Sequence, residues 1–417
     1  MPNHHVASPH VARSRPAART ARHLIVVAAA PLALALAGCR TATRADVAGE
    51  SPAAPCRPDT AVVARLQRLV DSVHAARPDA RGVALHAIAP ARCVARTFVA
   101  GTTGAPDGAP LVAGTPVRIA SNTKPYVAAA VLRLVEEGRV ALDDPIERHL
   151  SAEHLALLRQ GGYDPAAITV RHLLTHTGGL FDHAQDEEGY IGAIRRDPAR
   201  RWTRTDQLRH AVVRGRRLSP PGTAFSYSDT GYILLGELLE RVTGRPLAAA
   251  LRTLLDYDRL GLASTWLESL EPAPAGAPPR AHQWFGADDT FDWSPTIDLY
   301  GGGGLVATAR DMAVFTRALH TGAVFRRPET RALLRTSPVT PAAGSRMRYG
   351  IGTMERTVAG TLVLGHSGFW GTVALHAPDA DVTLATFVLH SGAARALATL
   401  EREALAALRD TTAARTP

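Results

Sequence analysis

Strand-like segments lie at both ends of this chain, and helical segments fill the middle. Residues 81–90 and 92–101 have the composition of two strands joined by a tight turn, and four more strand-like runs lie within residues 348–390. Residues 121–270 are mostly helical in pattern. Short turns among the C-terminal runs favour antiparallel pairing. We therefore expect an α/β (α+β) fold in which one antiparallel sheet, built from strands of both termini and flanked by helices, carries an inserted, mostly helical domain.

The same pattern predicts the domain boundaries. Residues 59–114 and 300–410 should form the α/β domain, and residues 115–299 the mostly helical one. No internal repeat divides the region, so residues 59–410 are expected to act as one unit. Helices are expected at residues 59–76, 125–138, 149–160, 170–175, 205–213, 232–243 and 394–408, and from about residue 308.

The first 39 residues have the pattern of an export signal. Four arginines precede an apolar run at residues 24–37, which is too short to span a bilayer comfortably. The run ends in Leu-Ala-Gly-Cys, which resembles the lipobox of bacterial lipoprotein precursors, where the cysteine is lipidated and becomes the new N-terminus. We therefore predict lipidation of Cys39, a tether over residues 40–58, and an exported protein that is lipid-anchored to the bacterial cell envelope. An uncleaved N-terminal anchor is the alternative.

Two further cysteines, Cys56 and Cys93, would then lie in an oxidising compartment, where pairing is favoured. A helix over residues 59–76 would be roughly 27 Å long, and a strand over residues 81–90 roughly 30 Å. An antiparallel helix–strand pair would bring Cys56 and the turn that carries Cys93 to the same end. We therefore predict a disulfide between them.

One residue is unusual in the charge composition. The chain contains 47 Lys and Arg residues, and Lys124 is the only lysine. Because Arg is effectively always charged whereas Lys can lose its proton, a single lysine indicates a position with proton chemistry.

Without the four arginines before Cys39, 43 basic and 38 acidic residues remain, a net charge of +5. No basic run is dense enough for a nucleic-acid site, so we expect no nucleic-acid partner. We also expect the protein to be a monomer.

Lys124 follows Ser121 by three residues at a predicted helix start. Pro125 lacks an N–H and is tolerated only in a first helical turn, which places the start close to Ser121. Ser121 and Lys124 would then lie on one face, with Ser121 beside free N–H groups at the positive end of the helix dipole. That arrangement suits a nucleophile whose intermediate is an oxyanion. The simpler interpretation is that Ser121 caps the helix.

Three further motifs follow Ser-x-x-Lys along the chain. They are His-Leu-Leu-Thr-His-Thr-Gly-Gly-Leu at residues 172–180, Tyr-Ser-Asp at residues 227–229 and His-Ser-Gly at residues 366–368. The ordered set resembles the serine β-lactamase and penicillin-binding protein superfamily. Within it, the resemblance is to class C β-lactamases, D-alanyl-D-alanine carboxypeptidases, D-aminopeptidases and related esterases, and it spans about residues 80–395.

The resemblance implies a role for each site residue. Ser121 would be the acylated nucleophile, Lys124 the amine beside it, and Tyr227 a proton relay to the leaving group; which of Lys124 and Tyr227 is the base stays open. The backbone N–H groups of Ser121 and Phe369 would form the oxyanion hole, and Gly368 would let substrate approach the strand edge. The implied substrate is a small molecule or peptide, namely an ester, a D-amino-acid peptide or a β-lactam. Neither a cofactor nor a metal is implied.

Two positions depart from class C β-lactamases. His366 replaces a lysine, and its positive charge is conditional, so a substrate carboxylate should be bound weakly or in a pH-dependent manner. Asp229 replaces the more usual Asn, and an ionised carboxylate cannot donate a hydrogen bond to a substrate carbonyl. Asp229 would also pair with Lys124 and favour its charged form, which moves the base role toward Tyr227. The change at Asp229 also lowers the expectation of strong penicillin hydrolysis.

Other interpretations of these segments are weaker. His172 and His176 have the i, i+4 spacing of a helical zinc site, but the accompanying Glu and a third ligand are missing. Ser367 lacks both the final Gly and the strand–turn–helix setting of a hydrolase elbow. The glycines at residues 301–304 lack the Lys of a P-loop and favour a tight backbone passage.

Two questions stay open from the sequence. Phe369 and Trp370 fit an acyl pocket and ordinary packing equally well. A non-catalytic lipoprotein that binds peptidoglycan peptides or penicillin is the alternative to an enzyme. Because a binding module has no use for Ser121, Lys124 and Tyr227 together, we predict a serine hydrolase that acts through a covalent acyl-enzyme on Ser121.

Overall fold

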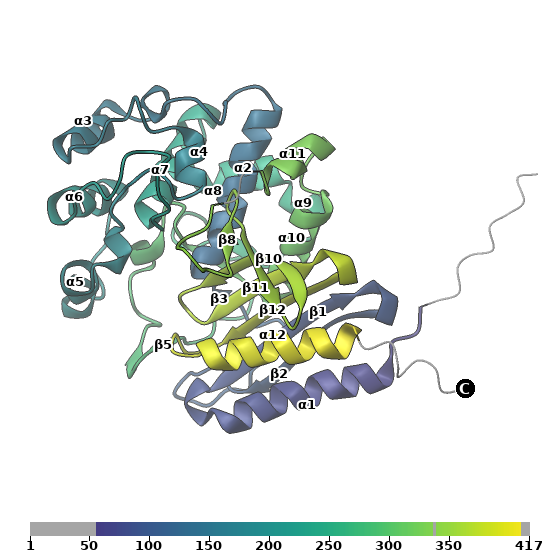
Figure 1. Cartoon of the computed structure of the whole chain (residues 1–417). Coiled ribbons are helices and arrows are strands. Elements are labelled where there is room, and N and C mark those ends of the chain that lie inside the picture. Colours follow the sequence, from purple (N-terminus) through teal and green to yellow (C-terminus); the bar gives the residue numbers. More distant parts are fainter. Residues whose placement is uncertain (1–55, 337–338, 410–417) are drawn as a thin grey trace, which may run out of the picture. The chain divides into compact units, whose positions relative to one another are not determined.

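The computed structural model describes residues 56–336 and 339–409, which belong to one compact unit. Its centre is a seven-stranded sheet in the order β2-β1-β12-β11-β10-β9-β8, with every neighbouring pair antiparallel (Figure 1). Val83 of β1 lies opposite Val388 of β12, so both ends of the chain meet in one sheet, and the predicted architecture is confirmed. The strands are β1 (Gly82–Ala89), β2 (Val94–Gly101), β8 (Arg348–Tyr349), β9 (Met354–Val358), β10 (Thr361–Gly368), β11 (Thr372–Ala377) and β12 (Val382–Val388).

Helices cover both faces of this sheet. α1 (Thr60–Ala76) and α12 (Ala394–Arg409) lie side by side on one face (Figure 1). α10 (Ala309–Thr321) packs on β1, β11 and β12. Successive strand residues point to opposite faces, so Leu384 joins the core under α1 and α12, whereas Ala385 joins the core under α10.

The first helix and the first hairpin are joined at one end. Asp59 caps α1 by accepting a hydrogen bond from the N–H of Val62 (3.1 Å), and it pairs with Arg92 in the hairpin turn (3.1 Å). At the same end Cys56 and Cys93 form a disulfide, with their Cα atoms 5.6 Å apart. The helix and the strand therefore run in opposite directions, as the disulfide prediction assumed.

A mostly helical region lies beside the sheet. Its central helix, α2 (Lys124–Glu136), is buried at every position as far as Leu134 and packs on α7 (Asp229–Thr243) and α8 (Leu247–Leu255). The sequence pattern predicted the short helices α3 and α4 but missed α5, α8, α9, α11 and two small sheets, whose strands are only two or three residues long. The other elements are α3 (Ala152–Gln160), α4 (Val170–Leu174), α5 (Gly192–Arg196), α6 (Arg204–Arg214), α9 (Tyr257–Leu260), α11 (Pro328–Leu333), β3 (Val117–Arg118), β4 (Thr265–Leu267), β7 (Leu305–Ala307), β5 (Trp284–Phe285) and β6 (Asp288–Asp289).

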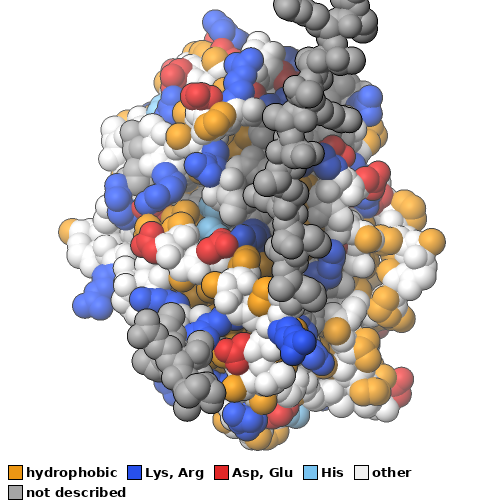
Figure 2. Space-filling view, turned by 90° about the vertical axis from the view of Figure 1, so that its right-hand side faces the viewer, with side chains coloured by type: hydrophobic (Ala, Val, Ile, Leu, Met, Phe, Trp, Pro, Cys, Tyr) orange, Lys and Arg blue, Asp and Glu red, His pale blue; other side chains and the backbone are white. Residues whose placement is uncertain are grey.

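Part of the predicted organisation is not tested by this structure. The division of residues 59–410 into two domains stays a prediction, and Cys39 lies outside the described residues, as does most of the tether predicted for residues 40–58. None of the helices that the structure describes is long and apolar enough to cross a bilayer. On the face shown in Figure 2, basic and acidic side chains are intermixed.

Candidate active site

Ser121 lies in a tight turn that leads directly into the buried helix α2. Ala120 has a φ of +47°, and a 3₁₀ turn from Ala120 to Thr123 precedes the α-helix, which begins at Lys124. A left-handed conformation at a non-glycine residue is strained and is enriched at functional sites. The N-cap position is Thr123 and its side chain makes no capping bond, so Ser121 is not the helix cap.

Lys124 is fully buried next to Ser121, and its ammonium group has three acceptors. Nζ donates to Oγ of Ser121 (2.9 Å), to the carbonyl oxygen of Gly302 (2.7 Å) and to the carboxylate of Asp229. Burial by itself would lower the pKa of Lys124, but Asp229 and Tyr227 outweigh it and raise that pKa above its ordinary value. Lys124 is therefore a charged hydrogen-bond donor to Ser121.

Tyr227 lies beside this pair, just before α7. The Nζ atom of Lys124 is 4.9 Å from the centroid of the Tyr227 ring. Burial raises the pKa of Tyr227, and its interactions with Lys124 and Ser121 offset this only in part. Both proton carriers thus hold their protons in the resting site.

The glycines at residues 301–304 pass against the Lys–Asp pair. A Cβ atom at Gly302 would lie 2.9 Å from a carboxylate oxygen of Asp229, and one at Gly303 would lie 2.0 Å from a carboxylate oxygen of Asp298. Only glycine allows the backbone to come this close to both acids. The run is a tight backbone passage beside the site, as the sequence indicated.

Two further carboxylates, Asp182 and Asp298, lie near Asp229, and no motif pointed to them. Asp182 is 6% exposed and accepts hydrogen bonds from the backbone N–H of Asp229 (3.1 Å) and from the side chain of Gln185 (2.8 Å). Burial and repulsion by Asp229 raise the pKa of Asp182 to about 7 and that of Asp298 to about 6. The only sequence signal was the place of Asp182 shortly after the His-Thr-Gly-Gly segment.

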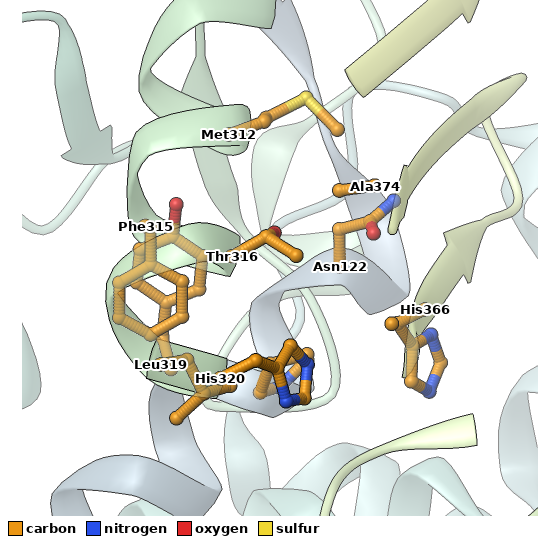
Figure 3. Close-up of a pocket in the computed structure, with 11 residues that line it drawn as sticks. Asn122, Met312, Phe315, Thr316, Leu319, His320, His366 and Ala374 are labelled. Carbon is orange, nitrogen blue, oxygen red and sulfur yellow. The ribbon is translucent and has the colours of Figure 1, made fainter. Parts of the chain in front are cut away.

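Asn122 joins the end of β10 to the nucleophile turn. With its amide oriented to satisfy both ends, it donates to the carbonyl oxygen of His366 (2.8 Å) and accepts from the N–H of Gly368 (3.2 Å). Figure 3 shows Asn122 and His366 on the wall of a small cavity that α10 closes.

A Cβ atom at Gly368 would lie 2.2 Å from the carbonyl oxygen of Ile119. Glycine is required because the turn bearing Ser121 comes this close. Gly368 also lines a pocket beside Ser121, and its expected role in admitting substrate stays a prediction.

His366 is buried, and both of its ring nitrogens are occupied within the protein. Nδ1 lies 2.7 Å from the carbonyl oxygen of Ser367, which can only accept, so Nδ1 carries the proton. Nε2 then accepts from the hydroxyl of Tyr349 (3.0 Å). Burial, with the charge of Lys124, lowers the pKa of His366 to about 3. The ring is neutral near pH 7, so the conditional positive charge expected for binding a substrate carboxylate is not present there.

A pocket of about 500 Å³ opens beside Ser121. Phe369, which is 49% exposed, and the buried Trp370 both line it. They also pack on other aromatic rings: Phe285 lies 5.1 Å from Phe369 and Trp293 lies 6.3 Å from Trp370, between ring centroids. Both interpretations of Phe369 and Trp370 therefore apply: the two side chains line the pocket and also pack on neighbouring aromatic rings.

The surroundings of Ser121 are acidic. Among the described residues that line this pocket, the only charged side chains are the carboxylates of Glu187, Asp229 and Asp298. A second pocket of about 410 Å³ shares Ser121, and the described residues that line it include neither Lys nor Arg and one histidine, His366. Any substrate group near Ser121 thus meets no unpaired cation in either lining.

The two histidines with zinc-like spacing have separate structural contacts. Nδ1 of His172 accepts from the backbone N–H of Thr169 (3.2 Å) and closes a capping box at the start of α4. His176 is buried, and its ring packs on that of Tyr227, with centroids 4.2 Å apart. Over residues 56–336 and 339–409, no group of three or more His, Cys, Asp or Glu side chains is placed to hold a metal ion.

A Ser–Lys pair with a tyrosine beside it lies against strand β10 of the antiparallel sheet, which is the arrangement of an activated serine nucleophile. The family follows from the sequence as a whole. Residues 66–408 match the model of the Beta-lactamase family, and the chain belongs to this family.

Similar proteins include esterases, amidohydrolases and penicillin-binding proteins. Over 175 residues the chain is 36% identical to the esterase EstB of Burkholderia gladioli, which covers 41% of this chain and 43% of that esterase. The matched region thus spans less than half of the length of that esterase. A D-stereospecific amidohydrolase from Streptomyces sp. has a TM-score of 0.70 and 25% identity, covering 82% of this chain and 98% of its own. A penicillin-binding protein from Bacillus halodurans, at 23% identity and a TM-score of 0.61 over 79% of this chain and 98% of its own, shares the fold.

Proposed function

We propose that this protein cleaves carboxylic esters or amides of small substrates through a covalent acyl-enzyme on Ser121. The observation that carries the proposal is the hydrogen bond from the fully buried Lys124 to Oγ of Ser121 (2.9 Å), next to an open pocket. A serine hydroxyl is a weak nucleophile until neighbouring groups assist its deprotonation. A buried ammonium group is unfavourable unless it is paired, so its placement against a pocket serine supports a chemical role.

The charge states favour a concerted proton relay through Tyr227. Because Lys124 is charged and Tyr227 is protonated in the resting site, neither is a free base. As Oγ of Ser121 bonds to the acyl carbon, its proton passes to the phenol oxygen, and the phenol proton passes to the departing oxygen or nitrogen. Water then attacks the acyl-enzyme, and the same relay runs in reverse. Lys124 stays charged and stabilises the negative charge that develops beside it.

The backbone N–H groups of Ser121 and Phe369 are the proposed oxyanion hole. Both residues line both pockets, and the bridge from Asn122 to β10 ties the nucleophile turn to the strand end. Donors fixed in this way before the reaction are each worth about 2.7–4 kcal/mol to a transition state with a developing oxyanion.

The linings of the two pockets favour substrates whose acyl group is apolar and carries no negative charge. Aromatic walls such as Phe369 and Trp370 suit an apolar group, and no unpaired cation is present for a carboxylate. The relatives named as an esterase and an amidohydrolase agree with an ester or amide. Penicillins and peptides ending in a free carboxylate are therefore the disfavoured substrates of this site.

A matched pair of esters tests both parts of the proposal. We expect p-nitrophenyl butyrate to be hydrolysed with a kcat/KM about 10- to 150-fold higher than that for p-nitrophenyl succinate, because the terminal carboxylate of the succinate would give up hydrogen bonds to water without finding a cation, at a cost of ~1.5–3 kcal/mol. The control is Ser121→Ala, which should abolish both activities. Equal rates for the wild type and Ser121→Ala would refute the mechanism, and a preference for the succinate would refute the charge argument.

The alternative is a non-catalytic module that binds penicillin or peptidoglycan peptides. A fluorescent penicillin separates the two: a binding module would be labelled without hydrolysing either ester. We further propose that the protein acts at the cell envelope through lipidated Cys39, for which the Leu-Ala-Gly-Cys sequence is the support.

A further inference from the structure

We propose that His176 is a positioning residue that fixes Tyr227 by holding the backbone on both sides of it; this inference rests on the proposed function. The carbonyl oxygen of His176 accepts a hydrogen bond from the N–H of Ser226 (2.8 Å). Its ring Nδ1 accepts one from the N–H of Ser228 (3.1 Å). One residue therefore engages both neighbours of the proposed relay tyrosine.

The geometry of an extended chain explains why a side chain is needed for the second contact. Ser228 is extended, with φ −151° and ψ 115°, and in an extended chain the N–H groups of residues two apart point to the same side. A neighbouring strand would supply two carbonyl oxygens there. The chain at His176 turns away instead, with φ +56°, so the imidazole nitrogen takes the place of the second carbonyl.

The ring of His176 also packs on the aromatic side chains around the site. Its centroid lies 4.2 Å from that of Tyr227, 4.7 Å from that of Tyr349 and 5.0 Å from that of Tyr232. Because Nδ1 accepts, the neutral ring carries its proton on Nε2, which is buried and has no hydrogen-bond partner among the described residues. A positive φ and an unpaired buried N–H both oppose stability, so stability alone does not explain this residue.

The expected consequence of losing this contact is a misplaced Tyr227 hydroxyl. A shift of about 1 Å in a reacting group lowers a rate by about 100-fold. His176 is absent from the linings of both pockets, so substrate binding should be little affected. The predicted signature is a lower kcat with an unchanged KM.

Three substitutions separate the contacts of His176. His176→Ala removes the acceptor and the ring, His176→Phe keeps a ring without the acceptor, and His176→Asn keeps an acceptor near the position of Nδ1 and tolerates the left-handed backbone. With p-nitrophenyl butyrate, we expect kcat to fall about 100-fold in the Ala and Phe variants. In the Asn variant kcat should stay within about tenfold of the wild type, and KM should be unchanged in all three.

The matched control is His172→Ala, since Nδ1 of His172 also accepts a backbone N–H, but at the other end of α4. Its kcat and KM should equal those of the wild type. Circular dichroism establishes that each variant is folded. A folded His176→Ala with wild-type kcat, or an Asn variant as impaired as the Ala variant, would overturn the proposal.

Hydrogen–deuterium exchange tests the clamp without relying on turnover. The amide of Ser228 should exchange at least tenfold faster in His176→Ala than in the wild type, while His176→Asn should protect it. The amide of Ser226, whose acceptor is the main-chain carbonyl of residue 176, should change much less. Unchanged exchange of the Ser228 amide in a folded His176→Ala variant would overturn the clamp itself. If the wild type and Ser121→Ala hydrolyse the ester equally, the proposed function fails, and the exchange result still decides whether His176 holds this segment.

Discussion

Asp182 is a buried carboxylate whose ionisation should destabilise this protein at neutral pH. It is 6% exposed, and burial together with repulsion by Asp229 raises its pKa from 3.8 to about 7. Between those values the folded protein holds a proton at Asp182 that the unfolded chain has lost. The free energy of unfolding therefore falls by about 1.4 kcal/mol for each pH unit in this interval, about 4 kcal/mol in all, and the change caused by this group is complete by about pH 8.

Asp182→Asn removes the charge and keeps an oxygen that can accept from the N–H of Asp229. The free energy of unfolding of the variant, relative to the wild type, should rise by about 2 kcal/mol between pH 5 and pH 7. Urea denaturation followed by tryptophan fluorescence at pH 5, 6, 7 and 8 measures this difference. Asp71→Asn, at an exposed position on α1, is the control. If the difference for Asp182→Asn does not change with pH, Asp182 has the same pKa in both states and the reasoning is refuted.

Three further predictions concern Lys124, the disulfide and the anchor. Lys124→Arg should lower kcat about 100-fold or more although the charge is kept, because a planar guanidinium does not fit three acceptors arranged around an ammonium; full activity would contradict this. Cys93→Ser should lower the free energy of unfolding by about 4 kcal/mol, for a bridge between residues 37 apart, without changing kcat; two free thiols in unreduced wild type would argue against it. Cys39→Ala should move the protein from the membrane to the soluble fraction, and retention in the membrane would exclude lipidation as the anchor.

Local patterns in the sequence were sufficient to predict the sheet and the turn that carries Ser121. The strand-like runs at both ends required a common sheet, and Val83 does lie opposite Val388. Pro125 placed a helix start near Ser121, and the helix begins at Lys124. These features depend on alternation, length and backbone chemistry within a few residues, all of which can be read from adjacent positions.

The sequence by itself determined the fold class, the family and the Ser–Lys–Tyr set, because their signals are local motifs in a fixed order. Only the tertiary structure decided the charge states of the site residues and showed why particular residue types are needed at several positions. His366 is neutral because it is buried between Tyr349 and its own backbone, and Gly368 is required by the nearby carbonyl of Ile119. Burial and charge–charge distances join residues far apart along the chain, so Asp182 could be recognised as part of the site only when folding had brought it beside Asp229.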